Sequence, residues 1–326
     1  MGKFIISNCF NRLSAVRESA ESAGYRFSEH LIDDSVFVLR SSKLKKDISR
    51  ILILDNGDFC VMAGSAIFRN QTGEEMLRCV YNEFSGNVEE LREKLLGQFL
   101  IAIFKNNEIT VFTDRYNLFE GYIYIDGDKW ALSNSIGDLA KLISHPTIDK
   151  IGLMQLPFFA GSIGTRTVFE NVSRILGDTT VTIDLLNNKI FSSRQNWLRS
   201  SINLPIQSDE EVIVNSLTNR IREVCRSVVN TFGEKVCINM TGGLDNRLVL
   251  AGFLNVGAKV ELIHGRGNSI ITNTRSEDYL VCRQYSEKLN LPLHIHDWRY
   301  NYDFDQMIND WQDSLHKYGI HFLIYR

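Results

Sequence analysis

Short apolar runs separated by polar turns fill the chain from residue 3 to residue 184. Runs of this kind, bounded by Gly, Asn, Asp and Ser, predict β-strands. The predicted strands are residues 3–7, 36–40, 51–54, 59–62, 99–104, 108–113, 121–125, 130–133 and 179–184. Residues 72–84 and 88–96 have helical spacing, and residues 153–159 fit either a strand or a helix. Because the strands follow one another in close pairs, as around Asn106 and Asn107, we expect antiparallel sheets with helices outside, an α+β domain.

The pattern changes after residue 207. Ser208 and Glu211 fit a capping box, and the helix that follows carries an apolar stripe formed by Ile213, Leu217, Ile221, Val224 and Val228. Strand-like runs at 236–240, 260–264 and 293–296 then alternate with helix-like segments at 246–256 and 276–289. Such alternation predicts a parallel sheet, the start of an α/β domain. The polar stretch 195–207 is the predicted linker between a domain at 1–194 and a domain at 208–326.

A glycine pair follows the first strand of the second domain. Residues 241–247, which read TGGLDNR and are named here the glycine-pair loop, connect the strand 236–240 to the next helix. Backbone amides converge in such a loop and the helix dipole adds partial positive charge, so the loop suits phosphate. Its spacing matches neither a Walker loop nor a dinucleotide fingerprint. Since ligands of parallel sheets bind at the carboxyl ends of the strands, we expect this loop and residues 264–267 at one crevice.

Composition narrows the classes of function. The 326 residues carry a net charge of −3, with 44% apolar and 23% charged side chains, which is typical of a globular chain without a broad basic surface for nucleic acid. No apolar stretch is long enough to span a membrane, and no secretory signal begins the chain. The cysteines show no CxxC pairing, and we expect reduced core thiols in a cytoplasmic protein; they are Cys9, Cys60, Cys79, Cys225, Cys237 and Cys282.

The glycine-pair loop resembles the pyrophosphate-binding loop of the asparagine synthetase family, whose usual form is SGGLDS. Thr241 keeps the hydroxyl of the first Ser, whereas Asn246 replaces the last Ser with an amide. Stretches of the first half also resemble the family's glutaminase-type domain in order and spacing: residues 97–99, 113–124, 130–134 and 165–184. The resemblance implies an Ntn-hydrolase-like α+β domain followed by an ATP-pyrophosphatase-like α/β domain.

The N-terminus departs from that family. The family's glutaminase uses a cysteine exposed at position one, because the α-amino group of that cysteine serves as the base. Here removal of Met1 would leave Gly2, and Cys9 carries no free amine. The resemblance therefore points to the branches that lack glutaminase chemistry, β-lactam synthetases and lasso-peptide cyclases, which join a carboxylate to an amine already present in the substrate.

The chemistry that the resemblance implies is ATP-dependent activation of a carboxylate. An acyl-adenylate and pyrophosphate form, an amine attacks, and AMP leaves. The residues expected to contact ATP and pyrophosphate are Thr241, Gly242, Gly243, Leu244, Asp245, Asn246, Arg247, His264, Gly265 and Arg266. Asp245 would bind Mg²⁺, and Arg247 or Arg266 would pair with phosphate. His264 would stack on adenine. The structural alternatives are a helix-capping Asp245, a solvated Arg247 and a structural His264 whose hydrogen bonds are satisfied.

Three functions stay open from the sequence, which identifies no catalytic residue. The family carries a second acidic loop, SGxGxDE, and a helical substrate-binding region, and neither is found before Arg326. We therefore expect a truncated amide- or lactam-forming ligase without glutaminase activity, acting on a small-molecule or peptide carboxylate and amine. The alternatives are an inactive nucleotide- or partner-binding member, with a homodimer or a partner chain to complete it, and an ammonia-dependent asparagine synthetase.

Overall fold

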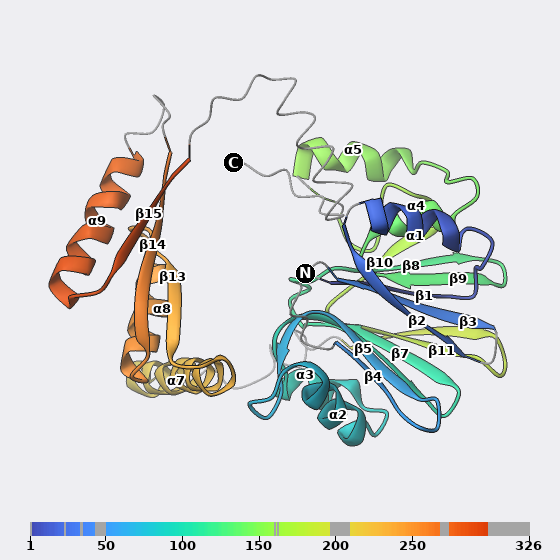
Figure 1. The fold of residues 1–326 in the computed structure, drawn as a ribbon, viewed down its shortest axis with the longest axis horizontal. Coiled ribbons are helices and arrows are strands. Elements are labelled where there is room, and N and C mark those ends of the chain that lie inside the picture. Colours follow the sequence, from blue (N-terminus) through green and yellow to red (C-terminus); the bar gives the residue numbers. More distant parts are fainter. Residues whose placement is uncertain are drawn as a thin grey trace. The chain divides into compact units, whose positions relative to one another are not determined.

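The chain folds into two compact units (Figure 1). The computed structural model describes residues 2–22, 24–32, 35–42, 50–159, 161, 163–195, 209–267 and 274–298. The first unit contains the described residues up to Gln195, and the second contains those from Asp209 onward. The predicted linker lies outside the described residues apart from Gln195, so the predicted domain boundaries stay a prediction.

The first sheet of the N-terminal unit is antiparallel throughout. Its strand order is β10-β8-β9-β1-β3-β2. The bounds are β1 Lys3–Ser7, β2 Arg26–Ile32, β3 Val36–Ser42, β8 Gly121–Asp126, β9 Lys129–Ser133 and β10 Val172–Ile175. The strand β1 is central and is buried along its whole length, because it has a neighbouring strand on both edges and packed side chains on both faces.

The second sheet of this unit is also antiparallel, with the order β12-β11-β7-β6-β5-β4. The bounds are β4 Ile51–Ile53, β5 Phe59–Ile67, β6 Leu96–Lys105, β7 Glu108–Thr113, β11 Thr179–Asp184 and β12 Lys189–Arg194. Asn106 and Asn107 connect β6 to β7 with φ angles of 54° and 62°. Positive φ at both central residues is typical of a tight hairpin turn and is tolerated by Asn, so the predicted hairpin is confirmed.

Helices cover the outer faces of both sheets, and the two inner faces share one core (Figure 1). On the first sheet pack α1 (Leu13–Ser22) and α4 (Ile136–Leu142), and on the second pack α2 (Gly73–Glu83) and α3 (Val88–Lys94). Residues 153–159, which fit a strand or a helix by sequence, belong to the helix α5 (Lys150–Phe159). The predicted α+β arrangement of antiparallel sheets with helices outside is confirmed.

The second unit contains a small parallel sheet in the order β13-β14-β15. Its elements are α7 (Glu210–Phe232), β13 (Lys235–Asn239), α8 (Leu244–Asn255), β14 (Lys259–Gly267), α9 (Thr274–Leu289) and β15 (Leu293–Trp298). Both strand pairs are parallel, as the alternation of strands and helices predicted. Within the described residues β13 is an edge strand, and only Ile238 on it is buried.

The start of α7 differs from the predicted capping box. Asp209, not Ser208, is the N-cap, and its carboxylate accepts hydrogen bonds from the backbone N–H groups of Glu211 and Val212. A carboxylate is favoured at this position because it also faces the positive end of the helix dipole. The predicted apolar stripe is half-buried only toward its C-terminal end, at Ile221, Val224 and Val228. Ile213 and Leu217 are 40% and 59% exposed. None of the described helices is long and apolar enough to cross a membrane.

Candidate phosphate-binding site

The glycine-pair loop leaves the parallel sheet at the carboxyl end of β13. Met240 follows β13 and donates its backbone N–H to the carbonyl of Ile263 at 2.7 Å, which holds the start of the loop against the middle of β14. His264 and Gly265 continue β14 beyond that point, paired with β15. The predicted loop and the predicted residues of β14 therefore lie at one edge of the sheet, where parallel sheets bind ligands. Arg266 pairs in register with Asp297, and its side chain is not among those described.

The helix α8 begins without a side-chain cap. Its N-cap residue is Gly243, and no side-chain hydrogen bond closes the first turn. The N–H groups of a first turn have no acceptors within the helix and lie at the positive end of its dipole. Leu244 is 75% exposed and Asp245 is also exposed, so this turn faces solvent and suits an anion. The interpretation of Asp245 as the N-cap of α8 is wrong, because Gly243 takes that position.

The hydroxyl oxygen of Thr241 accepts two hydrogen bonds within the loop. It accepts from the amide of Asn246 at 2.8 Å and from the backbone N–H of Gly243 at 3.2 Å. A hydroxyl has two acceptor positions and one proton, so two incoming donors leave the proton for a third group. Asn246, which stands where the family has Ser, therefore orients Thr241 toward an acceptor such as a phosphate oxygen.

Asp278, on the helix α9, forms a hydrogen bond to the loop. The carboxylate of Asp278, near the start of α9, accepts a hydrogen bond from the backbone N–H of Gly242 at 2.7 Å. A Cβ atom on Gly242 would lie 2.6 Å from this carboxylate oxygen, so the contact requires glycine. A carboxylate on a loop amide occupies the position that a phosphate oxygen would take.

His264 lies beneath the loop and is 3% exposed. Its Nδ1 donates to the carbonyl of Met240 at 2.9 Å, and the thiol of Cys282 donates to the same carbonyl at 3.1 Å. These two bonds fix the residue that precedes Thr241. A ring buried in this way, with Tyr279 beside it, offers no open face to a base, so the adenine-stacking prediction does not fit. Among the described residues Nε2 of His264 has no hydrogen-bond partner.

The charged groups at the loop fit a magnesium ion that phosphate helps to hold. Asp245 on α8 and Asp278 on α9 supply carboxylates. Mg²⁺ takes one or two carboxylates together with phosphate oxygens and water, in preference to a cage made by protein alone. The described residues contain no cluster of three or more His, Cys, Asp or Glu side chains placed to hold a metal. The Nε atom of Arg247 lies 3.4 Å from the carbonyl of Gly243.

The cysteines are free thiols, and they differ sharply in exposure. Cys60, Cys225 and Cys282 are buried, as predicted for core thiols, whereas Cys237 is exposed on the edge strand β13, so the core assignment is wrong for that residue. Burial raises the pKa of the Cys60 and Cys225 thiols and raises the pKa of Cys282 to about 11. The thiolate is the reactive form of cysteine. The buried thiols therefore react slowly, because reagents do not reach them and because little thiolate forms at their raised pKa.

We expect iodoacetamide to modify Cys237 of the native protein at least about tenfold faster than Cys282 at about pH 8. Raising the pH toward about 11 should increase the labelling of Cys282, since more of its thiol ionises as the pH nears the raised pKa. Peptide mass spectrometry of timed samples measures both rates. Equal rates for the two thiols in the native protein would contradict the burial of Cys282 under the loop.

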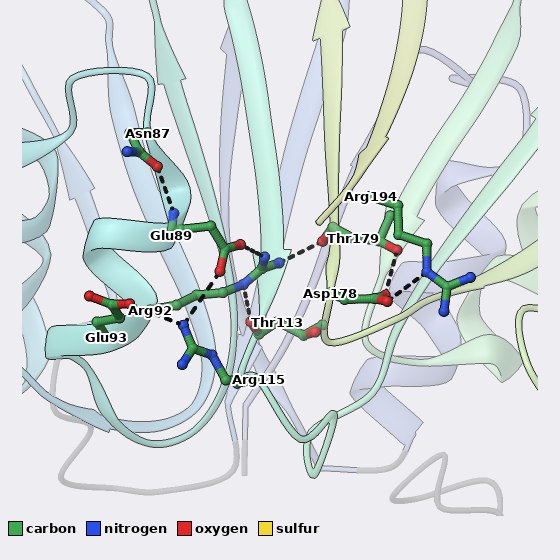
Figure 2. A network of polar contacts seen from close by, with 9 residues as sticks. All are labelled: Asn87, Glu89, Arg92, Glu93, Thr113, Arg115, Asp178, Thr179 and Arg194. Carbon is green, nitrogen blue, oxygen red and sulfur yellow. Dashed lines mark hydrogen bonds and ion pairs between the residues drawn. The ribbon is translucent and has the colours of Figure 1, made fainter. Parts of the chain in front are cut away.

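The N-terminal unit contains a buried arginine that the sequence analysis did not identify (Figure 2). The Arg92 side chain on α3 is 1% exposed. It forms an ion pair with Glu89 and donates to the carbonyl oxygens of Thr113 at 3.1 Å and Thr179 at 2.6 Å, at the ends of β7 and β11. Arg115 reaches the same Glu89 at 3.5 Å. Figure 2 shows the guanidinium of Arg92 between the helix and the two strands, so this side chain ties the second sheet to its covering helix.

The thiol of Cys9 follows β1 and has no catalytic environment. The backbone N–H of Cys9 donates to the hydroxyl of Ser7 at 2.9 Å, and the thiol lies 3.7 Å from the carbonyl of Trp130. Partial burial raises the pKa of this thiol, so it stays protonated near neutral pH. These contacts are consistent with the prediction that Cys9 is not a nucleophile.

Comparison with known proteins gives structural neighbours but no family. No protein-family model and no curated protein matches the chain. Solved structures that resemble it include the glutamine phosphoribosylpyrophosphate (PRPP) amidotransferase from B. subtilis complexed with ADP and GMP, with a TM-score of 0.37 and 11% identity over 84% of this chain and 68% of that chain. Another is described as the allosteric regulatory enzyme of purine biosynthesis, with a TM-score of 0.37 and 9% identity over 91% and 80% of the two chains. At these values neither structure identifies the fold or the activity of this chain.

Proposed function

We propose that the glycine-pair loop binds the phosphates of Mg·ATP and that the protein uses ATP to activate a carboxylate for amide formation. The observation that carries this proposal is the pairing of an uncapped helix start at α8 with a Thr241 hydroxyl whose proton is free to donate. Both groups lie at the carboxyl edge of a parallel sheet. Together they suit the pyrophosphate that leaves when a carboxylate attacks the α-phosphate.

The protein's own part in this reaction is positioning and charge stabilisation. A substrate carboxylate oxygen bonds to the α-phosphorus and pyrophosphate leaves with the bonding electrons; an amine then attacks the acyl carbon and AMP leaves. Thr241 and the backbone N–H of Leu244 would donate hydrogen bonds to the leaving pyrophosphate, and Asp245 and Asp278 would hold Mg²⁺, which supplies positive charge beside the phosphates. His264 and Cys282 act one layer below, since they fix the Met240 carbonyl next to Thr241.

The finer assignment follows the sequence resemblance. We propose an asparagine-synthetase-like ligase with an Ntn-hydrolase-like N-terminal unit and an ATP-pyrophosphatase-like second unit. The partial burial and raised pKa of Cys9 support an N-terminal unit in which this thiol does not act as a glutaminase nucleophile. The acyl acceptor would then be an amine carried by the substrate itself or free ammonia.

Exchange of radiolabelled pyrophosphate into ATP tests the reaction directly. With the full chain, Mg²⁺ and a panel of carboxylates that includes aspartate and peptide C-termini, we expect label to enter ATP only in the presence of an accepted carboxylate. The exchange requires reversible formation of an adenylate, so ATP hydrolysis cannot imitate it. Binding of Mg·ATP without exchange for any carboxylate would contradict the ligase proposal.

A second candidate is a nucleotide-binding protein without catalysis. The bond between Asp278 and Gly242 favours it, because this carboxylate occupies a loop amide that pyrophosphate would need during turnover. Under this alternative the protein binds Mg·ATP but releases neither AMP nor pyrophosphate. The exchange experiment therefore separates the two candidates.

A further inference from the structure

The contact between Asp278 and Gly242 brings a negative charge into a loop whose other groups attract anions. The carboxylate lies 2.7 Å from the backbone nitrogen of Gly242. This distance is typical of a charge-assisted hydrogen bond, which is stronger than a bond between neutral groups. The bond connects residues that are 36 positions apart in the chain, so it holds the start of α9 against the start of the loop.

A phosphate cannot use the Gly242 amide while Asp278 holds it. One N–H makes one strong hydrogen bond, so the phosphate oxygen and the carboxylate compete for the same donor. A phosphate bound to the neighbouring amides would lie close to the carboxylate, and like charges at this separation repel strongly where solvent is partly excluded. The loop therefore attracts and repels the same ligand.

The remaining charges of the site do not remove this conflict. The first turn of α8 carries Asp245, the first turn of α9 carries Glu277, and Asp278 follows Glu277 directly. The one described cation on the loop itself is Arg247, whose Nε lies 3.4 Å from the Gly243 carbonyl. By sequence, the two helix starts carry the carboxylates of Asp245, Glu277 and Asp278 and the guanidinium groups of Arg247 and Arg275, so their net charge is −1 (−3 + 2). A divalent cation placed between the carboxylates and the phosphate attracts both kinds of anion. It therefore offsets the repulsion between the phosphate and the carboxylates.

From this geometry we infer that Asp278 makes phosphate binding at the glycine-pair loop conditional on a divalent cation. Without the cation, the carboxylate stays on Gly242 and excludes pyrophosphate. With the cation, the carboxylate turns to the metal and releases the amide to a phosphate oxygen. The inference rests on the proposed function. It states that Asp278 makes the loop bind magnesium pyrophosphate in preference to metal-free pyrophosphate.

A simple structural role for Asp278 predicts a different result. If the carboxylate only anchored the loop, its loss would weaken every phosphate ligand to the same extent, with or without metal. Asparagine in this position keeps an oxygen that accepts from Gly242, so Asp278→Asn preserves the anchor and removes the charge. Glu277→Gln removes the same charge one residue earlier. Glu277 is exposed and forms no hydrogen bond to the loop within the described part of the chain, so this variant is a matched control.

The experiment is a titration of inorganic pyrophosphate into the full-length chain by calorimetry, first with EDTA and then with saturating MgCl₂. We expect the unmodified protein to bind pyrophosphate at least about tenfold more tightly with Mg²⁺ than with EDTA. We expect Asp278→Asn to bind metal-free pyrophosphate at least about tenfold more tightly than the unmodified protein and to lose most of its dependence on Mg²⁺. Glu277→Gln should keep the dependence of the unmodified protein.

The outcomes separate the inference from the function on which it rests. If the unmodified protein binds Mg·pyrophosphate but Asp278→Asn gains no metal-free binding, the inference is wrong and the proposed site stands. If Glu277→Gln gains as much as Asp278→Asn, general charge and not the Gly242 contact is responsible, and the inference is again wrong. If none of the proteins binds pyrophosphate under either condition, the proposed function fails as well. Circular dichroism of each variant confirms that its fold is retained.

Discussion

Replacing Arg92 with methionine is expected to lower the free energy of unfolding by about 3 kcal/mol. Methionine fills most of the volume of the side chain but cannot replace its charge or its donors. The substitution therefore leaves the carboxylate of Glu89 without its buried partner and the carbonyls of Thr113 and Thr179 without their side-chain donors (Figure 2). The effect is large because a buried polar group without a partner destabilises the folded state by its full desolvation free energy. That free energy exceeds the net stabilisation that the lost hydrogen bond had contributed. Arg115, at 3.5 Å from Glu89, keeps the loss near the lower end of the range.

Urea denaturation followed by circular dichroism measures this loss. Arg78→Met is the matched control, because Arg78 lies on the neighbouring helix α2 in a half-exposed pair with Glu74 and should change stability by less than about 0.5 kcal/mol. Adding Glu89→Gln to the Arg92→Met variant should recover part of the loss, since it removes the carboxylate left uncompensated. A loss below about 1 kcal/mol for Arg92→Met would show that Arg92 does not tie α3 to the second sheet.

Replacing Gly242 with alanine is expected to weaken the binding of Mg·ATP by about 100-fold, which corresponds to ~2.7 kcal/mol. The added Cβ atom would lie 2.6 Å from the carboxylate oxygen that now holds the Gly242 amide, so a phosphate oxygen could not reach that amide either. The magnitude is that of one charge-assisted hydrogen bond lost from the site. The fold should be preserved, because the displaced atom is the end of a side chain and not part of the backbone.

Gly243→Ala is the matched control for this loop. A Cβ atom there would meet the Thr241 hydroxyl at 3.3 Å, a contact that a small shift relieves, and Gly243 has no positive φ. We expect its affinity for Mg·ATP to stay within a few-fold of the unmodified protein. Both variants should be titrated with a non-hydrolysable ATP analogue in the presence of MgCl₂. Equal affinities for the two variants would place the phosphates away from Gly242.

The elements that the sequence predicted are those that bury a regular pattern of side chains. The central strands of both sheets, such as β1 and β7, are buried and apolar along most of their length, and each was visible as a run. Two of the strands that the pattern missed, β2 and β12, bury little. In β12 no residue is buried, and β2 buries only its last residue, Ile32, since both strands lie at the edges of their sheets. The helix α1 buries only Leu13 and Val16, too few to mark a helical stripe.

The parts of the candidate site formed by residues adjacent in sequence could be predicted. The contacts between residues far apart in sequence could not. The glycine pair, its preceding strand and its following helix are adjacent in sequence, so their geometry follows from short-range rules. The bond from Asp278 to Gly242 and the two bonds to the Met240 carbonyl depend on how α9 and β14 pack against β13. The sequence pattern could not show that His264 lies under the loop, because a histidine at the end of a strand can be buried or exposed.

The central claim is that the glycine-pair loop binds the phosphates of a nucleotide together with magnesium. Calorimetric titration of Mg·ATP into the full-length protein tests it most directly. We predict saturable binding with one ATP per chain, abolished in large part by Gly242→Ala and retained in Gly243→Ala. Absence of measurable binding by the unmodified protein, or equal binding by the unmodified protein and Gly242→Ala, would contradict the account.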